Sequence, residues 1–297
     1  MSNREIMEYD VVIVGAGPSG LSAAIKLKQL SKEADKDLSV CVVEKGSEVG
    51  AHILSGAVIE TKALDELIPD WKTRNCPLKT KANEDKFLYL TKTKSYQLPT
   101  PPQMHNEGNY IISLSDFTKW LAEQAELLEV EIYPGFSASE VLFNDKNKVI
   151  GIATCDMGRL KDGSEGPNFE QGIELHSKQT IFSEGCRGHL GKTLIQKFNL
   201  NAESSPQTYG IGIKELWEIL PEKSNPGNIL HTTGWPLKSD TYGGSFLYHL
   251  DKNKISIGFV IGLDYKNPYL SPYMEFQRFK HHPDIKKILE GGRRINY

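Results

Sequence analysis

A glycine-rich loop follows the first apolar run of this 297-residue sequence. The loop, Gly15-Ala16-Gly17-Pro18-Ser19-Gly20, comes directly after Asp10-Val11-Val12-Ile13-Val14. Between a strand and a helix, Gly15 permits a tight turn, Gly17 lets a pyrophosphate approach the backbone, and Gly20 lets the helix pack on the strand. Free N–H groups and the positive end of the helix dipole attract phosphates. The loop therefore predicts dinucleotide binding, with Pro18 and Ser19 among the contacts.

An acidic residue, Glu44, ends the next apolar run. Its carboxylate can accept both hydroxyls of an adenosine ribose, and each such bond contributes about 1.5 to 3 kcal/mol. An acid at this position disfavours a ribose with a 2′-phosphate. The competing interpretation is a glycine turn in an unrelated α/β fold with Glu44 on its surface. FAD and NAD share the fingerprint, so these residues leave the choice between them open.

Two other stretches are rich in small residues and could run beside a pyrophosphate or a flat ring. They are Gly50 to Gly56 and Ile181 to Gly188. On the residues alone, both are equally typical of ordinary turns. The further candidate cofactor contacts, in and near these stretches, are Lys45, His52, Ser55, Gly56 and Gly185.

The elements that must position these residues alternate between strands and helices. Tyr9 to Val14 and Leu38 to Glu44 are predicted strands on either side of a helix from Ser19 to Leu30. Further predicted helices are Thr61 to Ile68, one capped by Ser115, Leu190 to Phe198, and a basic segment after Pro272; further strands or β-rich stretches are 130–133, 139–143, 149–154, 173–177, 179–182, 207–213 and 245–263. This order predicts an α/β fold, in which a Rossmann-type domain (1–58 and 108–206) is interleaved with a second, α+β domain (59–107 and 207–297).

Composition and charge exclude several classes of partner. The net charge is -3 and no basic cluster is visible, which argues against nucleic-acid binding. The four cysteines (Cys41, Cys76, Cys155 and Cys186) are far apart and form no Cys-x-x-Cys pair, so no metal site is predicted. The longest apolar run, Ile255 to Leu263, is well short of the roughly 20 residues that span a bilayer.

Five stretches together resemble the electron-transfer flavoprotein:ubiquinone oxidoreductase family. The first is common to flavoproteins, and the later ones are far more specific. In order, they read Val14-Gly15-Ala16-Gly17-Pro18-Ser19-Gly20-Leu21, Gly50-Ala51-His52-Ile53-Leu54-Ser55-Gly56-Ala57, Pro206-Gln207-Thr208-Tyr209-Gly210-Ile211-Gly212, Thr241-Tyr242-Gly243-Gly244-Ser245-Phe246-Leu247-Tyr248 and Gly262-Leu263-Asp264-Tyr265-Lys266-Asn267-Pro268-Tyr269. The resemblance covers essentially the whole chain.

The resemblance implies that FAD is the dinucleotide, that reduced electron-transfer flavoprotein is the electron donor, and that ubiquinone is the acceptor. The activity would be that of an electron-transferring-flavoprotein dehydrogenase. The quinone headgroup would lie at Tyr242, Gly243 and Gly244 in the second domain, where residues without side chains admit a flat ring. On the residues alone, a β-bulge or turn is the competing interpretation. We assign no catalytic acid, base or metal ligand.

The resemblance also implies a membrane-dipping segment over residues 87–106. Its apolar side chains would enter the headgroup region and give peripheral association with a membrane, at roughly 1.5 to 3 kcal/mol per large side chain buried. The membrane would be the cytoplasmic face of a bacterial inner membrane, or the mitochondrial inner membrane for a mature eukaryotic form. The competing interpretation is a packed loop on a soluble enzyme. The expected membrane-facing residues are Phe87, Leu88, Leu90, Leu98 and Met104.

The family continues beyond the part that this sequence resembles. We therefore expect the strand and helix that complete the FAD site, and the four-cysteine domain that holds a 4Fe-4S cluster, to lie outside these 297 residues. Two alternatives stay open. The chain is an FAD-dependent monooxygenase or prenyl reductase, which share the phosphate loop, or it is an incomplete fragment without independent activity.

Overall fold

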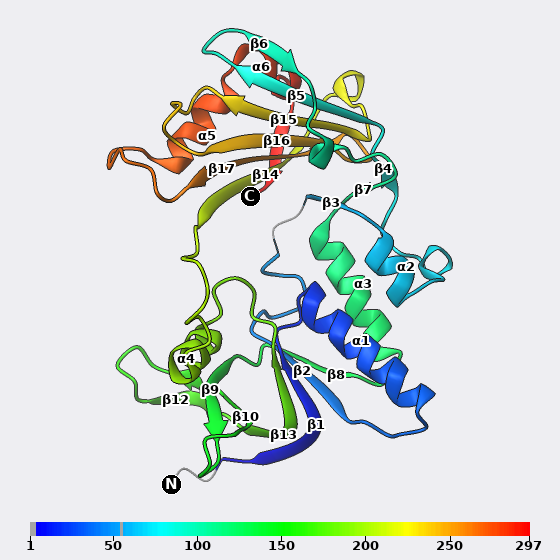
Figure 1. The fold of residues 1–297 in the computed structure, drawn as a ribbon, viewed down its shortest axis with the longest axis vertical. Helices are drawn as coiled ribbons and strands as arrows, with labels where there is room; N and C mark the ends of the chain where they lie inside the picture. Colours follow the sequence, from blue (N-terminus) through cyan, green and yellow to red (C-terminus); the bar gives the residue numbers. More distant parts are fainter. Residues whose placement is uncertain (1–3, 54–55) are drawn as a thin grey trace. The chain divides into compact units, whose positions relative to one another are not determined.

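The computed structural model describes residues 4–53 and 56–297 (Figure 1). The chain divides into two compact units, each built from two separated segments. The first unit contains Met1–Ile53 and Thr118–Ser205, and the second contains Leu54–Phe117 and Pro206–Tyr297. Both units contain strands and helices, which confirms the expected α/β fold with interleaved segments.

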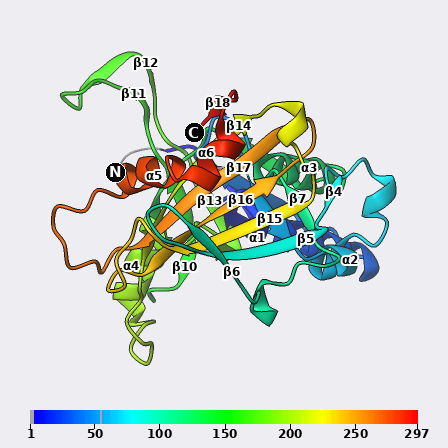
Figure 2. The same ribbon diagram turned by 90° about the horizontal axis from the view of Figure 1, so that it is seen from above.

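The first unit is organised around a six-stranded sheet in the order β8-β2-β1-β13-β10-β9. Four of its strands are parallel, with β1 between β2 and β13, and β10 and β9 continue the sheet antiparallel. The strands are β1 (Ile6–Val14), β2 (Val40–Glu44), β8 (Glu131–Pro134), β9 (Ala138–Phe143), β10 (Val149–Thr154) and β13 (Glu174–Phe182). A separate pair, β11 (Met157–Arg159) and β12 (Glu165–Glu170), forms a hairpin (Figure 2).

Helices cover both faces of this sheet. The run Val11 to Val14 is buried throughout, as expected for a central strand with apolar neighbours on both sides. α1 (Pro18–Glu33) buries Leu21, Ala24 and Ile25, and it lies along the same side as α3 (Leu114–Glu126) (Figure 1). α4 (His189–Phe198) buries Leu190 in the cluster on the opposite face, together with Val12 and Val14.

The second unit is organised around a seven-stranded sheet in the order β18-β14-β17-β16-β15-β5-β6. Its strands are β5 (Glu84–Leu90), β6 (Ser95–Leu98), β14 (Gly210–Glu218), β15 (Asn228–Gly234), β16 (Gly243–His249), β17 (Lys254–Gly262) and β18 (Arg293–Asn296). A small sheet contains β3 (Ala57–Ile59), β7 (Tyr110–Ile112) and β4 (Thr80–Lys81); the helical elements are α2 (Lys62–Leu67), α5 (Pro272–Lys280), α6 (Pro283–Leu289) and the 3₁₀ turns η1 (Trp71–Thr73), η2 (Pro102–Met104) and η3 (Pro221–Lys223). No helix in the described part of the chain is long and apolar enough to cross a membrane.

The pairing register assigns each side chain of the seven-stranded sheet to one face, because paired residues point the same way and successive residues point oppositely. One face carries Leu90, Leu247 and Phe259, which pack in one core cluster with Phe276 and Phe279 of α5. We call this the helix face. The other face carries the residues of the candidate site, and we call it the glycine face; it includes Phe87, Tyr89, Tyr96, Leu98, Gly212, Lys214, His231, Gly244, Phe246, Tyr248, Gly258 and Val260.

Three sequence-based expectations differ from the structure. α3 begins at Leu114, and Ser113 caps its N-terminus instead of Ser115. The Ser113 carbonyl accepts from Phe117 N, and the Ser113 Oγ accepts from Asp116 N at 3.3 Å. The strands expected at 173–177 and 179–182 form one strand, β13, because its pairing with β1 continues on both sides of Lys178, whose side chain forms an ion pair with Asp10. The segment from Phe87 contains parts of β5 and β6, which the sequence pattern did not predict.

The assignment of β5 side chains to the two faces of the sheet can be tested by measuring the stability of variants. Leu90 is 1% exposed in the helix-face core and Tyr89, its neighbour, is 45% exposed on the other face. We expect Leu90→Ala to lower the free energy of unfolding by about 2–5 kcal/mol, because it leaves a cavity, and Tyr89→Ala to change it by about 0.5 kcal/mol. Chemical denaturation of the 297-residue chain measures both values. Equal losses from the two variants would contradict this assignment of faces.

Candidate functional site

The phosphate loop joins the carboxyl end of β1 to the start of α1. Gly15 has φ 105° and its N–H donates to the Val43 carbonyl of β2 at 2.8 Å. A Cβ on Gly15 would lie 2.5 Å from the Ser183 carbonyl oxygen, and one on Gly20 would lie 2.1 Å from the Gly15 carbonyl oxygen. Neither position has room for a side chain, so both glycines are required by the backbone packing of the unit itself.

Gly17 differs from these two glycines. It is the N-cap of α1 with extended backbone angles, φ −77° and ψ 175°, which every residue type tolerates. A Cβ placed on it would meet no atom of the described residues within 4 Å. The space before the helix N-terminus is therefore open, and the protein's own packing does not explain a glycine here. A phosphate held close to the backbone N–H groups does explain it.

Glu44, at the end of β2, binds the loop directly. Its Oε2 accepts from the Ala16 N–H at 3.0 Å and its Oε1 accepts from the Gly46 N–H at 2.7 Å. A carboxylate has about four lone-pair positions, so two acceptor positions are left for ribose hydroxyls. Glu44 thus holds the loop in place, a role that the sequence pattern did not predict, and it keeps the capacity for the predicted one.

The second glycine turn lies at the same edge of the sheet. β13 pairs with β1 up to Val14 and Phe182, and the Ser183 N–H donates to the Val14 carbonyl at 2.8 Å. Gly185 follows with φ 79°, exposed to solvent. Glu184, which the sequence analysis missed, caps α4 by accepting from the N–H groups of Leu190 at 3.2 Å and Gly191 at 2.7 Å. An acidic residue shortly before a helix was the available signal.

The remaining predicted cofactor contacts are distributed differently. Lys45 and His52 are exposed in the first unit, where His52 lies beside Gly46. Ser55 lies outside the described residues, and Gly56 belongs to the second unit. In the described part of the chain, no group of three or more His, Cys, Asp or Glu side chains could hold a metal ion.

In the second unit, Gly243 and Gly244 lie within β16, where they pair with Ile261 and Val260 of β17. They are therefore strand residues in a ladder with no register shift between β16 and β17, and not the β-bulge or turn of the competing interpretation. Only Gly244 is on the glycine face, since Gly243 pairs with Ile261 of the helix-face core. Tyr242, which precedes the strand, is 80% exposed.

The glycine face is flat around Gly244. The register places Gly212, Val260 and Gly244 side by side on β14, β17 and β16. A Cβ on Gly244 would lie 2.6 Å from the Thr232 carbonyl oxygen, so the sheet itself requires this glycine. A Cβ on Gly212 would come no closer than 3.7 Å to Val260, and Gly212 is exposed. Like Gly17, Gly212 has open space where a side chain would fit, so packing does not explain why this residue is a glycine.

The next row of the glycine face is aromatic and carries one ammonium group. Lys214 Nζ donates to the Gly56 carbonyl at 2.9 Å and lies 5.3 Å from the centre of the Phe246 ring. Burial lowers the pKa of Lys214, and burial also lowers the pKa of His231, against an opposing effect of Asp85. His231 Nε2 lies 3.1 Å from the Tyr248 hydroxyl, whose pKa burial raises to about 12. The phenol is therefore neutral over the physiological range.

The expected membrane-facing residues fall on two different faces. Phe87 and Leu98 pair on the glycine face, whereas Leu88 and Leu90 point to the helix face. Leu90 is fully buried in the core, so the expectation that it contacts a membrane is wrong for this structure. Met104, in η2, is half-buried. The exposed large side chains of the hairpin are instead Tyr89 and Tyr96, at 45% and 52%.

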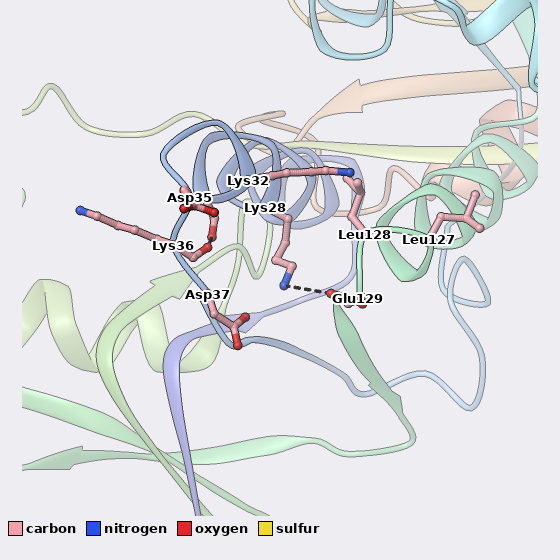
Figure 3. Close-up of a pocket in the computed structure, with 9 residues that line it drawn as sticks. Lys28, Lys32, Asp35, Lys36, Asp37, Leu127, Leu128 and Glu129 are labelled. Carbon is pink, nitrogen blue, oxygen red and sulfur yellow. Dashed lines mark hydrogen bonds and ion pairs between the residues drawn. The ribbon is translucent and has the colours of Figure 1, made fainter.

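Two cavities are lined largely by charged and polar residues. One, of about 590 Å³, is at the far end of α1 from the phosphate loop. Figure 3 shows that lysines and acidic side chains alternate around it, and Lys28 approaches Glu129 at 4.0 Å. The other cavity, of about 490 Å³, lies beside Asp85 and His105 in the second unit. The charges around the first cavity balance, so it shows no preference for an anionic ligand.

Comparison with known proteins finds one family model that matches the segment with the glycine face and another that matches the segment with the phosphate loop. A family model described as "ETF-QO, ubiquinone-binding" matches residues 209–297, which contain β14, β16 and β17. A model of the Thi4 family matches residues 2–67, which contain the phosphate loop.

Curated relatives match nearly the whole chain. The mitochondrial electron transfer flavoprotein-ubiquinone oxidoreductase of Dictyostelium discoideum is 61% identical over 99% of this chain and 48% of its own length. The enzyme of the same name from Pseudomonas aeruginosa is 56% identical over 99% of this chain and 54% of its own length. A solved structure, a geranylgeranyl bacteriochlorophyll reductase-like protein from Thermoplasma acidophilum, superimposes with a TM-score of 0.69 at 16% identity over 98% of this chain and 65% of its own; it shows the fold alone.

The chain thus combines a phosphate loop, a glycine-faced sheet within a segment that matches a ubiquinone-binding model, and high identity to one group of enzymes along almost its entire length. It spans about half the length of the curated relatives that it matches, and it belongs to the electron transfer flavoprotein-ubiquinone oxidoreductase family.

Proposed function

We propose that this chain binds FAD in its first unit, binds ubiquinone in its second, and takes part in electron transfer from reduced electron-transfer flavoprotein to ubiquinone. The observation that carries the proposal is the pair of unexplained open glycines, Gly17 and Gly212. Each leaves room for a ligand at a position where packing alone would accept a side chain. One lies in a dinucleotide loop, and the other lies within the segment that matches the ubiquinone-binding model.

In the first unit, the N-terminus of α1 and the N–H groups after Gly17 bind the pyrophosphate, and the free lone pairs of Glu44 accept the adenosine ribose hydroxyls. Gly185 leaves room beside them. Bound FAD supplies the redox chemistry, since it accepts electrons and passes them on, and the protein contributes orientation and environment. The carboxylate of Glu44 disfavours a phosphorylated ribose, which supports FAD or NAD over NADP.

In the second unit, the quinone ring lies over Gly244, Val260 and Gly212, with Tyr242 at the end of the same sheet. A flat surface without large side chains allows close contact with a planar ring, which aromatic and apolar neighbours then enclose. Phe246 borders the surface, and the outer end of its ring lies so close to Gly258 that a Cβ there would be 2.2 Å from its Cζ. Lys214 keeps an ammonium group in the same row.

Peripheral membrane association is part of this proposal, because ubiquinone is dissolved in the bilayer. The turn between β5 and β6 has exposed Lys92 and Lys94 beside the exposed tyrosines Tyr89 and Tyr96. Tyrosine at the headgroup level together with lysine near anionic lipid is the pattern of an interfacial contact. The exposed tyrosines and lysines of this hairpin, and not Leu88 and Leu90 on the helix face, are the residues that meet the membrane in this proposal.

The FAD site is tested by Gly17→Val. Because a Cβ at Gly17 has open space, the variant should retain the stability of the flavin-free protein, while its side chain fills the place of the pyrophosphate. We expect FAD affinity to fall at least about 100-fold, equivalent to roughly 2.7 kcal/mol. Titration of the flavin-free chain with FAD, followed by fluorescence, measures this. Gly20→Ala is the contrasting variant, because it should reduce stability itself; FAD affinity unaffected by Gly17→Val would contradict the site.

The quinone site is tested by Gly212→Val, which avoids the clash with the Thr232 carbonyl that a side chain at Gly244 would create. We expect about 10-fold weaker binding of tail-free ubiquinone and slower quinone reduction by the dithionite-reduced, flavin-loaded protein. Ile211→Ala, next to it but on the opposite face, is the control. Unchanged quinone binding in Gly212→Val, or rapid NADPH oxidation by the wild-type protein, would favour a monooxygenase or prenyl reductase instead.

The membrane contact is tested by Lys92→Glu with Lys94→Glu. Each lysine near an anionic surface contributes about 1 kcal/mol, so we expect at least about a 10-fold loss of binding to vesicles that contain phosphatidylserine. The loss should diminish in high salt. Lys79→Glu with Lys252→Glu, two exposed lysines away from this turn, makes the same change in net charge. Equal losses from the two double variants would show that net charge alone, and not this hairpin, governs binding.

A further inference from the structure

Lys214 stands at the border between the covered and the open part of the glycine face. On one side of it, the small sheet covers the face, since Leu216 packs in one cluster with Val58 of β3 and Ile111 of β7. On its other side lies the row of residues proposed for the quinone ring. That row is Gly212, Val260 and Gly244.

The ammonium group of Lys214 is half-buried, and no carboxylate of the described residues pairs with it. Its Nζ donates to the Gly56 carbonyl at 2.9 Å and lies 5.3 Å from the centre of the Phe246 ring. The Gly56 backbone is held against the sheet, because a Cβ there would lie 2.0 Å from Ser256 Oγ. An ammonium group has three N–H donors, so two remain beyond the bond to Gly56.

The helix face treats a half-buried lysine differently. Lys280 of α5 reaches Glu215, the chain neighbour of Lys214, at 2.8 Å, and Glu215 is only 2% exposed. A buried charge without an opposite charge costs free energy. The protein therefore compensates a lysine on the face where no ligand is proposed, and leaves Lys214 uncompensated on the face where one is proposed.

This ammonium group is within reach of a ring in the next row. Lys214 and Gly258 pair in one row, and Val260 lies two residues further along β17, at about 6.8 Å. A ring over Val260 with one carbonyl directed along the strand spans about half of this gap, and a hydrogen bond of about 2.9 Å spans the rest. The ring oxygen nearest to Gly258 is thus an acceptor for Lys214.

The surroundings of Lys214 also make it a better acid than an exposed lysine, because burial lowers its pKa. β17 presents Gly258 and Ser256 to it and the covering segment presents a backbone carbonyl, none of which titrates. The titratable side chains on the same face, His231 and Tyr248, share a hydrogen bond with each other.

We propose that Lys214 hydrogen-bonds one carbonyl oxygen of the quinone and donates a proton to it as the ring is reduced. This inference rests on the proposed function. Reduction to the quinol takes two electrons, which come from the reduced flavin, and two protons. One proton comes from Lys214: its N–H bond breaks, an O–H bond forms on the ring, and the nitrogen keeps the electron pair as a neutral amine. Water returns a proton to the amine, and the second ring oxygen takes its proton from solvent.

Lys214 should influence the rate of quinone reduction more than the affinity for quinone. Negative charge develops on the ring oxygens only as electrons arrive, so the ammonium group stabilises the ring more strongly during reduction than before it. This difference separates the proposed role from simple binding.

The experiment follows reoxidation of the dithionite-reduced, flavin-loaded 297-residue chain by ubiquinone without a tail. We expect Lys214→Met to slow this reaction at least about 30-fold, equivalent to roughly 2 kcal/mol, and to weaken quinone binding, measured by calorimetry, at most about threefold. The wild-type rate should fall as the pH rises through the lowered pKa of Lys214, because the donor is then deprotonated. The rate of the methionine variant should lack this fall.

Two further variants and a second electron acceptor separate proton donation from a structural role. Lys214→Gln keeps an N–H donor for the Gly56 carbonyl but has neither charge nor an acidic proton, so it should be as slow as Lys214→Met. Lys252→Met removes an exposed lysine of the same unit and should change nothing. Ferrocenium takes one electron and no proton, so it should oxidise the reduced flavin of every variant within about twofold of the wild-type rate.

The outcomes distinguish this inference from the proposed function. If Lys214→Met reduces quinone at the wild-type rate while Gly212→Val weakens quinone binding, the inference fails and the proposed function stands. Recovery of the rate in Lys214→Gln, or equal slowing with ferrocenium, would show that Lys214 only holds the Gly56 segment in place, and would overturn proton donation. If ferrocenium but not quinone oxidises the wild-type flavin, both fail.

Discussion

Close approach of backbone to backbone at a few glycines is the constraint on which both candidate sites depend. The helix that would bind phosphate can begin where it does because Gly20 touches the Gly15 carbonyl and Gly15 touches that of Ser183. β1, β13 and α1 are thereby brought to one point at the edge of the sheet. Any side chain at Gly15 or Gly20 would separate these elements by more than a hydrogen bond can span.

The same constraint operates differently in the second unit. There, the seven-stranded sheet sets the chemistry through register, because a shift of one residue would exchange the two faces of a strand. In the observed register, Gly212, Gly244 and Gly258 share one face with Val260, while the neighbouring apolar side chains build the core under α5 and α6. The alternation of glycines and large apolar residues along these strands therefore produces a smooth surface on one face of the sheet and a packed core on the other.

These two kinds of glycine have different meanings for function. Gly15, Gly20 and Gly244 are explained by the fold, since a Cβ on any of them would collide with backbone. Gly17 and Gly212 are not, because a side chain would fit in the protein without a ligand. The fold therefore distinguishes glycines that maintain structure from glycines that leave room for something else, and the second kind carries the functional argument.

The sequence by itself determined the phosphate loop, the βαβ unit around it and the family, because these depend on residues that are neighbours in the chain or on stretches that can be compared directly. It also indicated Glu44, whose position at a strand end is local. Only the tertiary structure decided that Glu44 binds the Ala16 and Gly46 N–H groups. It also decided that Gly243 and Gly244 lie on opposite faces of the sheet. In the same way, it placed Leu90 in the core and left Tyr89 exposed. These properties depend on which distant strand pairs with which and in what register. No local pattern around β5 states that β15 and β6 will be its neighbours.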